Sequence, residues 1–168
     1  DLPGFSIGPK ERKMGIRGSD THSLMFNDVK VPKENRIGED GFGFKFAMKT
    51  LAGGRIGIAS QALGIASGAY ELALKYSKER KSFGTEICNH QVIAFKLADM
   101  AVNIEAARHL CLKAAWDKDN GKNYDISGAM AKLFASQTAM DTTIEAVQIH
   151  GGYGFVKEYH VERLMRDA

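Results

Sequence analysis

Residues 44–76, with the sequence FKFAMKTLAGGRIGIASQALGIASGAYELALKY, carry the strongest structural signal of the chain. Apolar or small side chains recur in this stretch every three or four residues, which is the period of an α-helix. No proline follows Pro32, so no residue with a fixed φ interrupts the remaining backbone. The sequence predicts one long helix whose repeating positions are Phe44, Met48, Leu51, Arg55, Ile58, Ala62, Ile65, Ala69, Leu72 and Tyr76.

Glycines are frequent in this predicted helix. Each one costs about 1 kcal/mol relative to alanine in a helix interior. Their number suggests close approach of another backbone or of a ligand, and ordinary helix packing is the simpler of the two explanations. The glycines concerned are Gly53, Gly54, Gly57, Gly64 and Gly68.

Two more long helices and the start of a fourth follow along the chain. Apolar periodicity predicts a helix over 89–116, a polar loop over 117–123 and a third helix that Asp125 caps. The third helix ends at Gly151-Gly152, where glycine favours a C-cap, and a short helix starts near Tyr159. Short loops between long helices predict a mainly α, antiparallel up-and-down bundle.

A short β segment precedes the helices. Residues 23–26 and 29–31 are two short apolar runs on either side of Asn27-Asp28, a turn signal, and predict a hairpin. Two isolated strands are marginally stable in water. We therefore expect them to belong to a larger sheet, and the chain, which begins at Asp1 without a methionine, to be a piece of a longer protein.

Composition excludes several classes of protein. The 168 residues are 44% hydrophobic and 26% charged, as in an ordinary soluble domain. The net charge of +3 is too small to indicate a nucleic-acid surface, and no apolar run is long enough to span a membrane. Cys88 and Cys111 show neither CxxC nor metal-ligand spacing, so we expect reduced thiols and no metal site.

Two places in the helical part have the chemistry of an anion site. Arg80 follows the first helix, and a guanidinium can hold a pyrophosphate with two parallel hydrogen bonds. Gly151-Gly152 lets a backbone approach a nucleotide closely. Each feature alone also has a structural explanation, as a solvated charge at a helix end and as a C-cap.

Taken in order, the motifs of the chain resemble the acyl-CoA dehydrogenase family, and specifically its short-chain, butyryl-CoA-dehydrogenase-like branch. The resemblance covers nearly the whole chain. Its segments are 13–19 (KMGIRGS), 31–35 (VPKEN), 41–44 (GFGF), 54–66 (GRIGIASQALGIA), 95–100 (FKLADM), 148–155 (QIHGGYGF) and 166–168 (RDA).

The resemblance implies a domain division and an assembly. Members of the family have an N-terminal helical domain, a middle β domain and a C-terminal helical bundle. Residues 1–36 accordingly look like the tail of the middle domain, and 37–168 look like the C-terminal bundle, cut short in its fourth helix. The family usually assembles as a homotetramer built on this bundle.

The resemblance also implies FAD as cofactor. In the family, the residues that match Arg80 and Gln91 bind the adenosine diphosphate end of FAD across a subunit boundary, and the stretch that matches 148–152 completes the pocket. His150 stands where relatives often carry an apolar residue. The expected cofactor-binding residues are Arg80, Phe83, Gln91, Gln148, Ile149, His150, Gly151 and Gly152.

The reaction that the resemblance implies is oxidation of a short-chain acyl-CoA to trans-2-enoyl-CoA. A glutamate removes the α proton while the flavin takes the β hydrogen as hydride. In most branches that glutamate lies beyond the segment matching Ala168, and the alternative location aligns with Gly54, so we expect no catalytic residue in this chain and no activity from it alone. Arg55 is the expected substrate-binding residue, whereas Ala52 replaces a common acid.

Partners and competing functions complete these expectations. The resemblance implies an acyl-CoA substrate, an electron-transfer flavoprotein as electron acceptor, and a location in the bacterial cytoplasm or the mitochondrial matrix. One alternative is a helical oligomerisation module without activity. Another is a superfamily member with a different reaction, such as an acyl-CoA reductase, oxidase or desulfinase.

Overall fold

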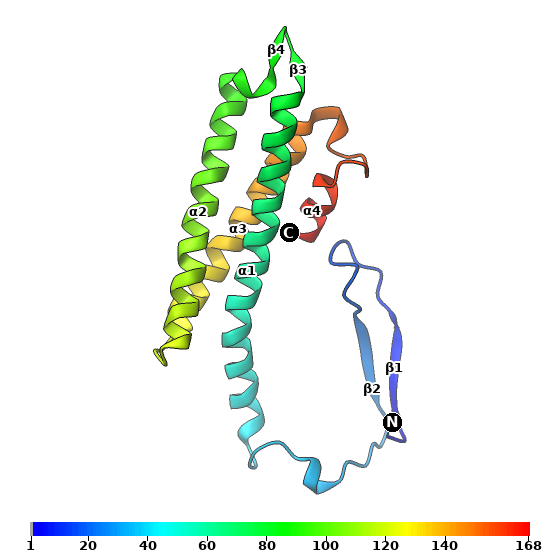
Figure 1. Ribbon diagram of the computed structural model, residues 1–168. Coiled ribbons are helices and arrows are strands. Elements are labelled where there is room, and N and C mark those ends of the chain that lie inside the picture. Colours follow the sequence, from blue (N-terminus) through cyan, green and yellow to red (C-terminus); the bar gives the residue numbers. More distant parts are fainter. Residues whose placement is uncertain (1) are drawn as a thin grey trace. The chain divides into compact units, whose positions relative to one another are not determined.

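A computed structural model describes residues 2–168 of the chain, which fall into two units with a boundary after Lys49. The first unit holds a two-stranded sheet and the start of the first long helix, and the second holds the rest of that helix and the other helices (Figure 1). The boundary lies inside the first long helix, so the helix is continuous through it. The division between residues 36 and 37 therefore stays a prediction about domains.

The sheet of the first unit pairs β1 (Phe5–Lys10) with β2 (His22–Phe26) in antiparallel fashion. Phe5 lies opposite Phe26, and their ring centroids are 5.3 Å apart. The register shifts between Ile7 and Lys10, which marks an irregularity in the ladder. A single 3-10 turn, η1 (Lys33–Asn35), follows.

Of the two strands of the predicted hairpin, the structure contains the first and not the second. Residues 23–26 do form part of β2, but 29–31 form no strand, and the partner strand is β1. A two-residue hairpin of the common type needs positive φ at both central residues. Only Asp28 has it, at 50°, and the N–H of Asn27 instead donates to the carbonyl of Gly4 at 2.9 Å.

The second unit is an antiparallel bundle, as predicted (Figure 1). A small hairpin joins the first two long helices and a short loop joins the second to the third. In chain order the elements are α1 (Phe42–Glu79), β3 (Lys81–Ser82), β4 (Thr85–Glu86), η2 (Ile87–Asn89), α2 (Gln91–Asp119), α3 (Asp125–His150), η3 (Gly151–Tyr153) and α4 (Val161–Asp167).

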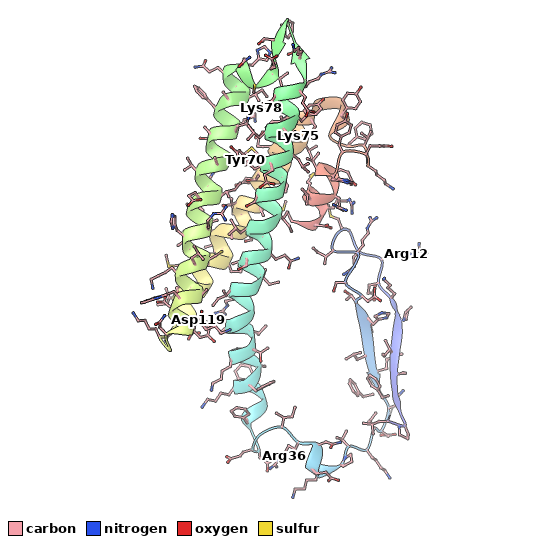
Figure 2. The ribbon with its side chains drawn as sticks, in the orientation of Figure 1. Arg12, Arg36, Tyr70, Lys75, Lys78 and Asp119 are labelled. Atoms are coloured by element: carbon pink, nitrogen blue, oxygen red, sulfur yellow. The ribbon has the colours of Figure 1, made fainter. Side chains whose placement is uncertain are left out.

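Alanines dominate the core of this bundle. Two clusters of buried side chains fill it, and Tyr70 of α1 (labelled in Figure 2) packs against both. Alanine lets helix backbones approach closely because its side chain adds one methyl group. The first cluster consists of Ala59, Ala62, Ala66, Ile104, Ala107, Cys111, Ala114, Ala131, Ala135 and Ala139. The second consists of Ala69, Ala73, Leu97, Met100, Ala146, Ile149 and Val161.

The larger apolar side chains of the predicted stripe on α1 do not fill this core. Phe44 is 77% exposed, and Met48, Leu51 and Ile58 are also exposed. The buried face of α1 is formed by Ala52, Ala59, Ala62, Ala66, Ala69, Ala73 and Ser77. Periodicity found the helix but weighted the larger residues, and α1 is apolar on more than one face.

Two further expectations need correction. Asp125 is the first residue of α3 rather than its cap, and its N–H donates to Asn123 Oδ1 at 2.9 Å. A Cβ added at Gly54, Gly57 or Gly64 would meet no atom of the described chain within 4 Å. These glycines therefore do not mark a close approach within the bundle.

Candidate functional site

Arg80 is held at the end of α1 by backbone hydrogen bonds on both sides. Its N–H donates to the carbonyl of Tyr76 at 2.8 Å, and its own carbonyl accepts from the N–H of Ile87 at 2.9 Å. The chain then turns through the β3–β4 hairpin into α2. The guanidinium is left exposed, so it can meet a ligand while its backbone stays fixed.

A pocket of about 320 Å³ opens beside Arg80, between the C-terminal ends of α1 and α3. Five of the residues that line it were predicted from the sequence to bind a cofactor, namely Arg80, Ile149, His150, Gly151 and Gly152. The structure adds Tyr76, Ile87 and Tyr153. Tyr76 belongs to the repeating positions of the α1 sequence, but only the fold shows that it faces α3.

Aromatic rings form one wall of the pocket. The rings of Tyr76 and His150 are stacked, with centroids 4.2 Å apart and planes 19° apart. Tyr159 meets both rings edge-on, at 5.8 Å and 5.7 Å between centroids. The guanidinium carbon of Arg80 lies 5.9 Å from the centroid of the Tyr153 ring, within reach of a cation–π interaction.

Burial sets the charge state of this wall. His150 is 4% exposed, and its Nδ1–H donates to the carbonyl of Ala146 at 2.7 Å. Burial lowers the pKa of His150, against a smaller opposite effect of that hydrogen bond, and burial raises the pKa of Tyr76. Both side chains are therefore uncharged at neutral pH, and the positive charge of the pocket comes from Arg80.

Three glycines follow α3, and each has a different structural role. Gly151 caps α3 with a φ of 56°, a conformation that favours glycine. A Cβ at Gly152 would meet nothing within 4 Å, so the backbone there is open to a ligand. A Cβ at Gly154 would lie 2.2 Å from the carbonyl oxygen of Val147, so Gly154 is needed for packing.

Three predicted cofactor-binding residues lie outside the pocket wall. Phe83 is at the tip of the β3–β4 hairpin, 100% exposed, with a φ of 51°. Gln91 begins α2, and Gln148 lies in the last turn of α3; both are exposed. A hydrogen bond of 2.9 Å between Ser82 Oγ and His90 Nε2 fastens the hairpin to the start of α2.

The arrangement can bind a ligand and, among the described residues, offers no carboxylate as a general base. A permanent cation, an aromatic wall and an open backbone corner fit a flat, anionic molecule. No carboxylate is among the residues that line this pocket in the described chain.

Arg55, the predicted substrate residue, is far from this pocket. It is exposed on α1, and the 24 residue steps from Arg55 to Glu79 span about 36 Å of helix. Its neighbour Ala52 is buried, and the carbonyl of Ala52 lies near Gly128 of α3. Substrate and cofactor contacts of this chain would thus come from well-separated parts of α1 and its C-terminal end.

A larger hollow, of about 610 Å³, lies in the first unit and has no comparable site chemistry. It is lined by Lys10, Glu11, Arg12, Lys13 and Arg17; Arg12 is labelled in Figure 2. Lys10 pairs with Asp20, Lys13 bonds two carbonyl oxygens, and Arg17 donates to the carbonyl of Lys13. Most of its cations therefore serve local structure.

The described residues hold neither a group of metal-ligating side chains nor a membrane-spanning helix. Within 2–168, no three His, Cys, Asp or Glu side chains gather as they would around a metal ion. None of the helices in this range has the length and apolar character needed to cross a bilayer. Cys88 and Cys111 are both free thiols.

Comparison with known proteins decides the family. A family model described as "Acyl-CoA dehydrogenase, C-terminal domain" matches residues 41–168. The chain belongs to the acyl-CoA dehydrogenase family. The matched range contains the whole pocket beside Arg80 and all four α-helices.

The relatives within the acyl-CoA dehydrogenase family are close. The short-chain specific acyl-CoA dehydrogenase of Megasphaera elsdenii is 58% identical over 166 residues, which cover 99% of this chain and 43% of that protein. A subunit of a caffeyl-CoA reductase-Etf complex from Acetobacterium woodii is 53% identical over 165 residues, which cover 98% of this chain and 44% of that protein.

A solved structure agrees with the family assignment. Butyryl-CoA dehydrogenase from Megasphaera elsdenii matches with a TM-score of 0.96 and 58% identity, over 99% of this chain and 43% of that one. The helical fold of this chain is therefore the fold of the acyl-CoA dehydrogenase C-terminal region. The chain spans less than half the length of the relatives that it matches.

Proposed function

We propose that the protein containing this chain is a flavin-dependent acyl-CoA dehydrogenase that converts a short-chain acyl-CoA to the trans-2-enoyl-CoA. The observation that carries the proposal is the pocket in which the Arg80 guanidinium, the Tyr76–His150 stack and the Gly151-Gly152 corner lie together. The family, and the similarity to short-chain enzymes, support the choice of reaction.

The residues of the pocket fit the adenosine diphosphate half of FAD. This half offers a flat base and two phosphates, which suit an aromatic wall and a guanidinium. The open backbone at Gly152 leaves space for close approach. The exposed Phe83, Gln91 and Gln148 are the remaining candidate contacts, and we propose that the site is completed across a subunit boundary in a homotetramer.

When bound, FAD supplies the oxidation by accepting a hydride from the β carbon of the acyl group. The residues of this chain bind and orient the cofactor, and they supply no base. Gly54 has no side chain, and the pocket wall holds no carboxylate in the described chain. We assign proton abstraction to a glutamate in another part of the protein and expect no turnover from the 168 residues alone.

Cofactor binding to the whole protein tests this proposal. Arg80→Ala should weaken FAD binding about 10- to 100-fold, because a charge-assisted hydrogen bond is lost. Lys78→Ala is the matched control, since Lys78 is an exposed cation two residues earlier on α1 and does not line the pocket (Figure 2). Failure of the wild-type protein to bind FAD, or to bleach its flavin with butyryl-CoA, refutes the proposal.

The acyl-CoA substrate is assigned to Arg55. Its exposed guanidinium is available to the polar part of a thioester ligand, and it lies well away from the cofactor pocket. Arg55→Ala should raise KM for butyryl-CoA about tenfold and leave FAD binding unchanged. A fall in FAD affinity of similar size would contradict this division of roles.

Two competing functions have specific observations in their favour. The relative from Acetobacterium woodii is named as part of a reductase-Etf complex, which favours an acyl-CoA reductase and also supports an electron-transfer flavoprotein as partner. Exposed apolar side chains on the long helices, such as Leu133 at 73%, favour a helical oligomerisation module. The test is oxidation of butyryl-CoA with electron-transfer flavoprotein as the acceptor. A dehydrogenase should show this activity in the wild-type protein and lose it in the Arg80→Ala protein. Neither a reductase nor an oligomerisation module should give this pair of results.

The compartment is part of the same proposal. The free thiols of Cys88 and Cys111 fit a reducing environment. We therefore propose the bacterial cytoplasm or, in a eukaryotic cell, the mitochondrial matrix. Fractionation of the source cell, followed by thiol labelling without prior reduction, tests this assignment.

A further inference from the structure

One nitrogen of the buried His150 ring has no hydrogen-bond partner among residues 2–168. Nδ1 donates to the carbonyl of Ala146, and that is the only hydrogen bond of the side chain among the described residues. Every side-chain nitrogen or oxygen that is shut off from solvent in residues 2–168 does have a partner. Nε2 must therefore reach solvent, although the residue is only 4% exposed.

The small exposed part of His150 opens into the pocket beside Arg80. His150 is one of the residues that line this pocket, and its other neighbours enclose it. Tyr76 covers one face of the ring at 4.2 Å, and Tyr159 meets it edge-on at 5.7 Å. Turning the ring over would break the bond to Ala146, so the packing holds Nε2 toward the cavity.

The chemistry of Nε2 follows from its environment. A carbonyl can only accept, so Nδ1 carries the proton and Nε2 of the neutral ring carries a lone pair. The titratable groups that contact the ring are Tyr76 and Tyr159, and Tyr153 and Arg80 line the same pocket. Burial lowers the pKa of His150 and keeps the imidazole neutral, so Nε2 is an acceptor at pH 7.

We propose that His150 Nε2 accepts a hydrogen bond from the exocyclic amino group of adenine and thereby selects adenine in this pocket. The inference rests on the proposed function, in which the ligand is FAD. Adenine linked through N9 has a single hydrogen-bond donor group, its amine. A base without that amine would leave a nearly buried acceptor unpaired, which weakens binding.

The experiment compares two probes on the apo form of the whole protein. They are FAD and a FAD analogue in which purine, without the amino group, replaces adenine. Wild-type protein should bind the analogue about tenfold more weakly than FAD. His150→Leu should bind both probes with equal affinity, and His150→Gln, which keeps an acceptor at the tip, should restore part of the preference.

A control and a pH series sharpen the test. His160→Leu, which removes an exposed histidine outside the pocket, should keep the wild-type preference for FAD. Protonation of His150 removes the lone pair, and burial lowers the pKa of this imidazole, so FAD affinity of the wild-type protein should fall only at a pH below the ordinary imidazole pKa of about 6.5. His150→Leu should lack this fall. Tighter binding at low pH in the wild-type protein alone would mean that His150 donates to phosphate, and would overturn the proposal.

The possible failures are distinguishable. If the whole protein binds neither probe, the proposed function falls together with the inference. If wild-type protein binds FAD and the analogue with equal affinity, the role of His150 falls and the proposed function stands. If His150→Leu does not fold, the wild-type preference and its retention in His150→Gln still decide the matter.

Discussion

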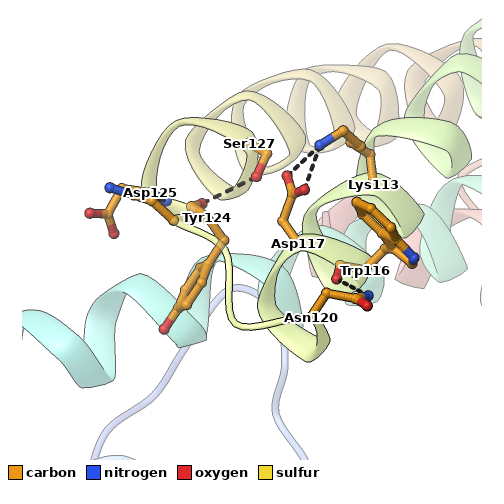
Figure 3. A network of polar contacts seen from close by, with 8 residues as sticks. Lys113, Trp116, Asp117, Asn120, Tyr124, Asp125 and Ser127 are labelled. Carbon is orange, nitrogen blue, oxygen red and sulfur yellow. Dashed lines mark hydrogen bonds and ion pairs between the residues drawn. The ribbon is translucent and has the colours of Figure 1, made fainter.

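Both carboxylate oxygens of Asp117 accept hydrogen bonds from the ammonium group of Lys113, one turn earlier on α2, at 2.6 and 2.5 Å (Figure 3). Asp117 is 3% exposed, whereas Lys113 is largely exposed. The carbonyl of Asp117 also accepts from the N–H of Lys122 at 2.9 Å. The side chain and backbone of one residue thus organise the turn between α2 and α3.

Removing the charge of Asp117 should destabilise the bundle in a pH-dependent way. Lys113, and then Ser127, lower the pKa of Asp117 below its unfolded value of about 3.9. Its contribution is therefore complete above that value and is lost as the pH falls through the folded-state pKa. Asp117→Asn should lower the urea midpoint at pH 7, and the difference from wild type should shrink below pH 4.

Asp119→Asn is the control for this effect. Asp119 is two residues further along α2 and exposed (Figure 2). We expect its substitution to shift the urea midpoint several times less than Asp117→Asn does, because an exposed charge contributes little. Equal shifts for the two variants would show that the Lys113–Asp117 pair does not stabilise the turn.

Alanine at the two glycines after Gly151 should separate folding from ligand binding. Gly154→Ala places a Cβ 2.2 Å from the carbonyl oxygen of Val147 and should cost about 1–3 kcal/mol of unfolding free energy. Gly152→Ala meets nothing within 4 Å and should leave stability within about 0.5 kcal/mol of wild type. Thermal denaturation of the apo protein measures both, and FAD titration of Gly152→Ala then reports the space the ligand needs.

Phe83, at the tip of the β3–β4 hairpin, should lower the stability of the fold and contribute to FAD binding. Phe83 has a φ of 51° and a fully exposed side chain, a conformation that costs a residue other than glycine about 1 kcal/mol. Asparagine tolerates this conformation, so Phe83→Asn should raise the unfolding free energy by up to about 1 kcal/mol. The same variant should weaken FAD binding to the assembled protein, measured by titration. Lower stability with unchanged FAD binding would contradict both expectations.

The helices and part of the pocket beside Arg80 could be predicted from the sequence, because local backbone preferences determine them. Apolar periodicity and the position of the last proline predict the bundle, and Gly151 has the positive φ that favours glycine at a helix end. Arg80 and His150 proved to line one pocket. Tyr76 and Tyr153 were missed as wall residues because a tyrosine on a helix face looks like packing until the opposite helix is known.

The buried face of the bundle could not be predicted from side-chain size. Large apolar residues such as Ile126, 76% exposed, lie on the outside of α3, while Ala131 and Ala135 are fully buried. A hydrophobicity scale ranks isoleucine above alanine, but close helix contact requires small side chains. Periodicity therefore predicts the helices, and it places Ala62 and Ala69 correctly in the core, but it does not show that the larger side chains at the start of α1 lie outside it.

This alanine interface gives a direct test. Ala107 of α2 is fully buried in the first cluster, so Ala107→Leu forces three more carbons between closely packed helices and should cost about 1–3 kcal/mol. Ala98→Leu makes the same change at an exposed position of α2 and should alter stability by less than about 0.5 kcal/mol. Urea denaturation of both variants measures the difference. Equal tolerance would show that the helices can move apart, and that small side chains do not set their spacing.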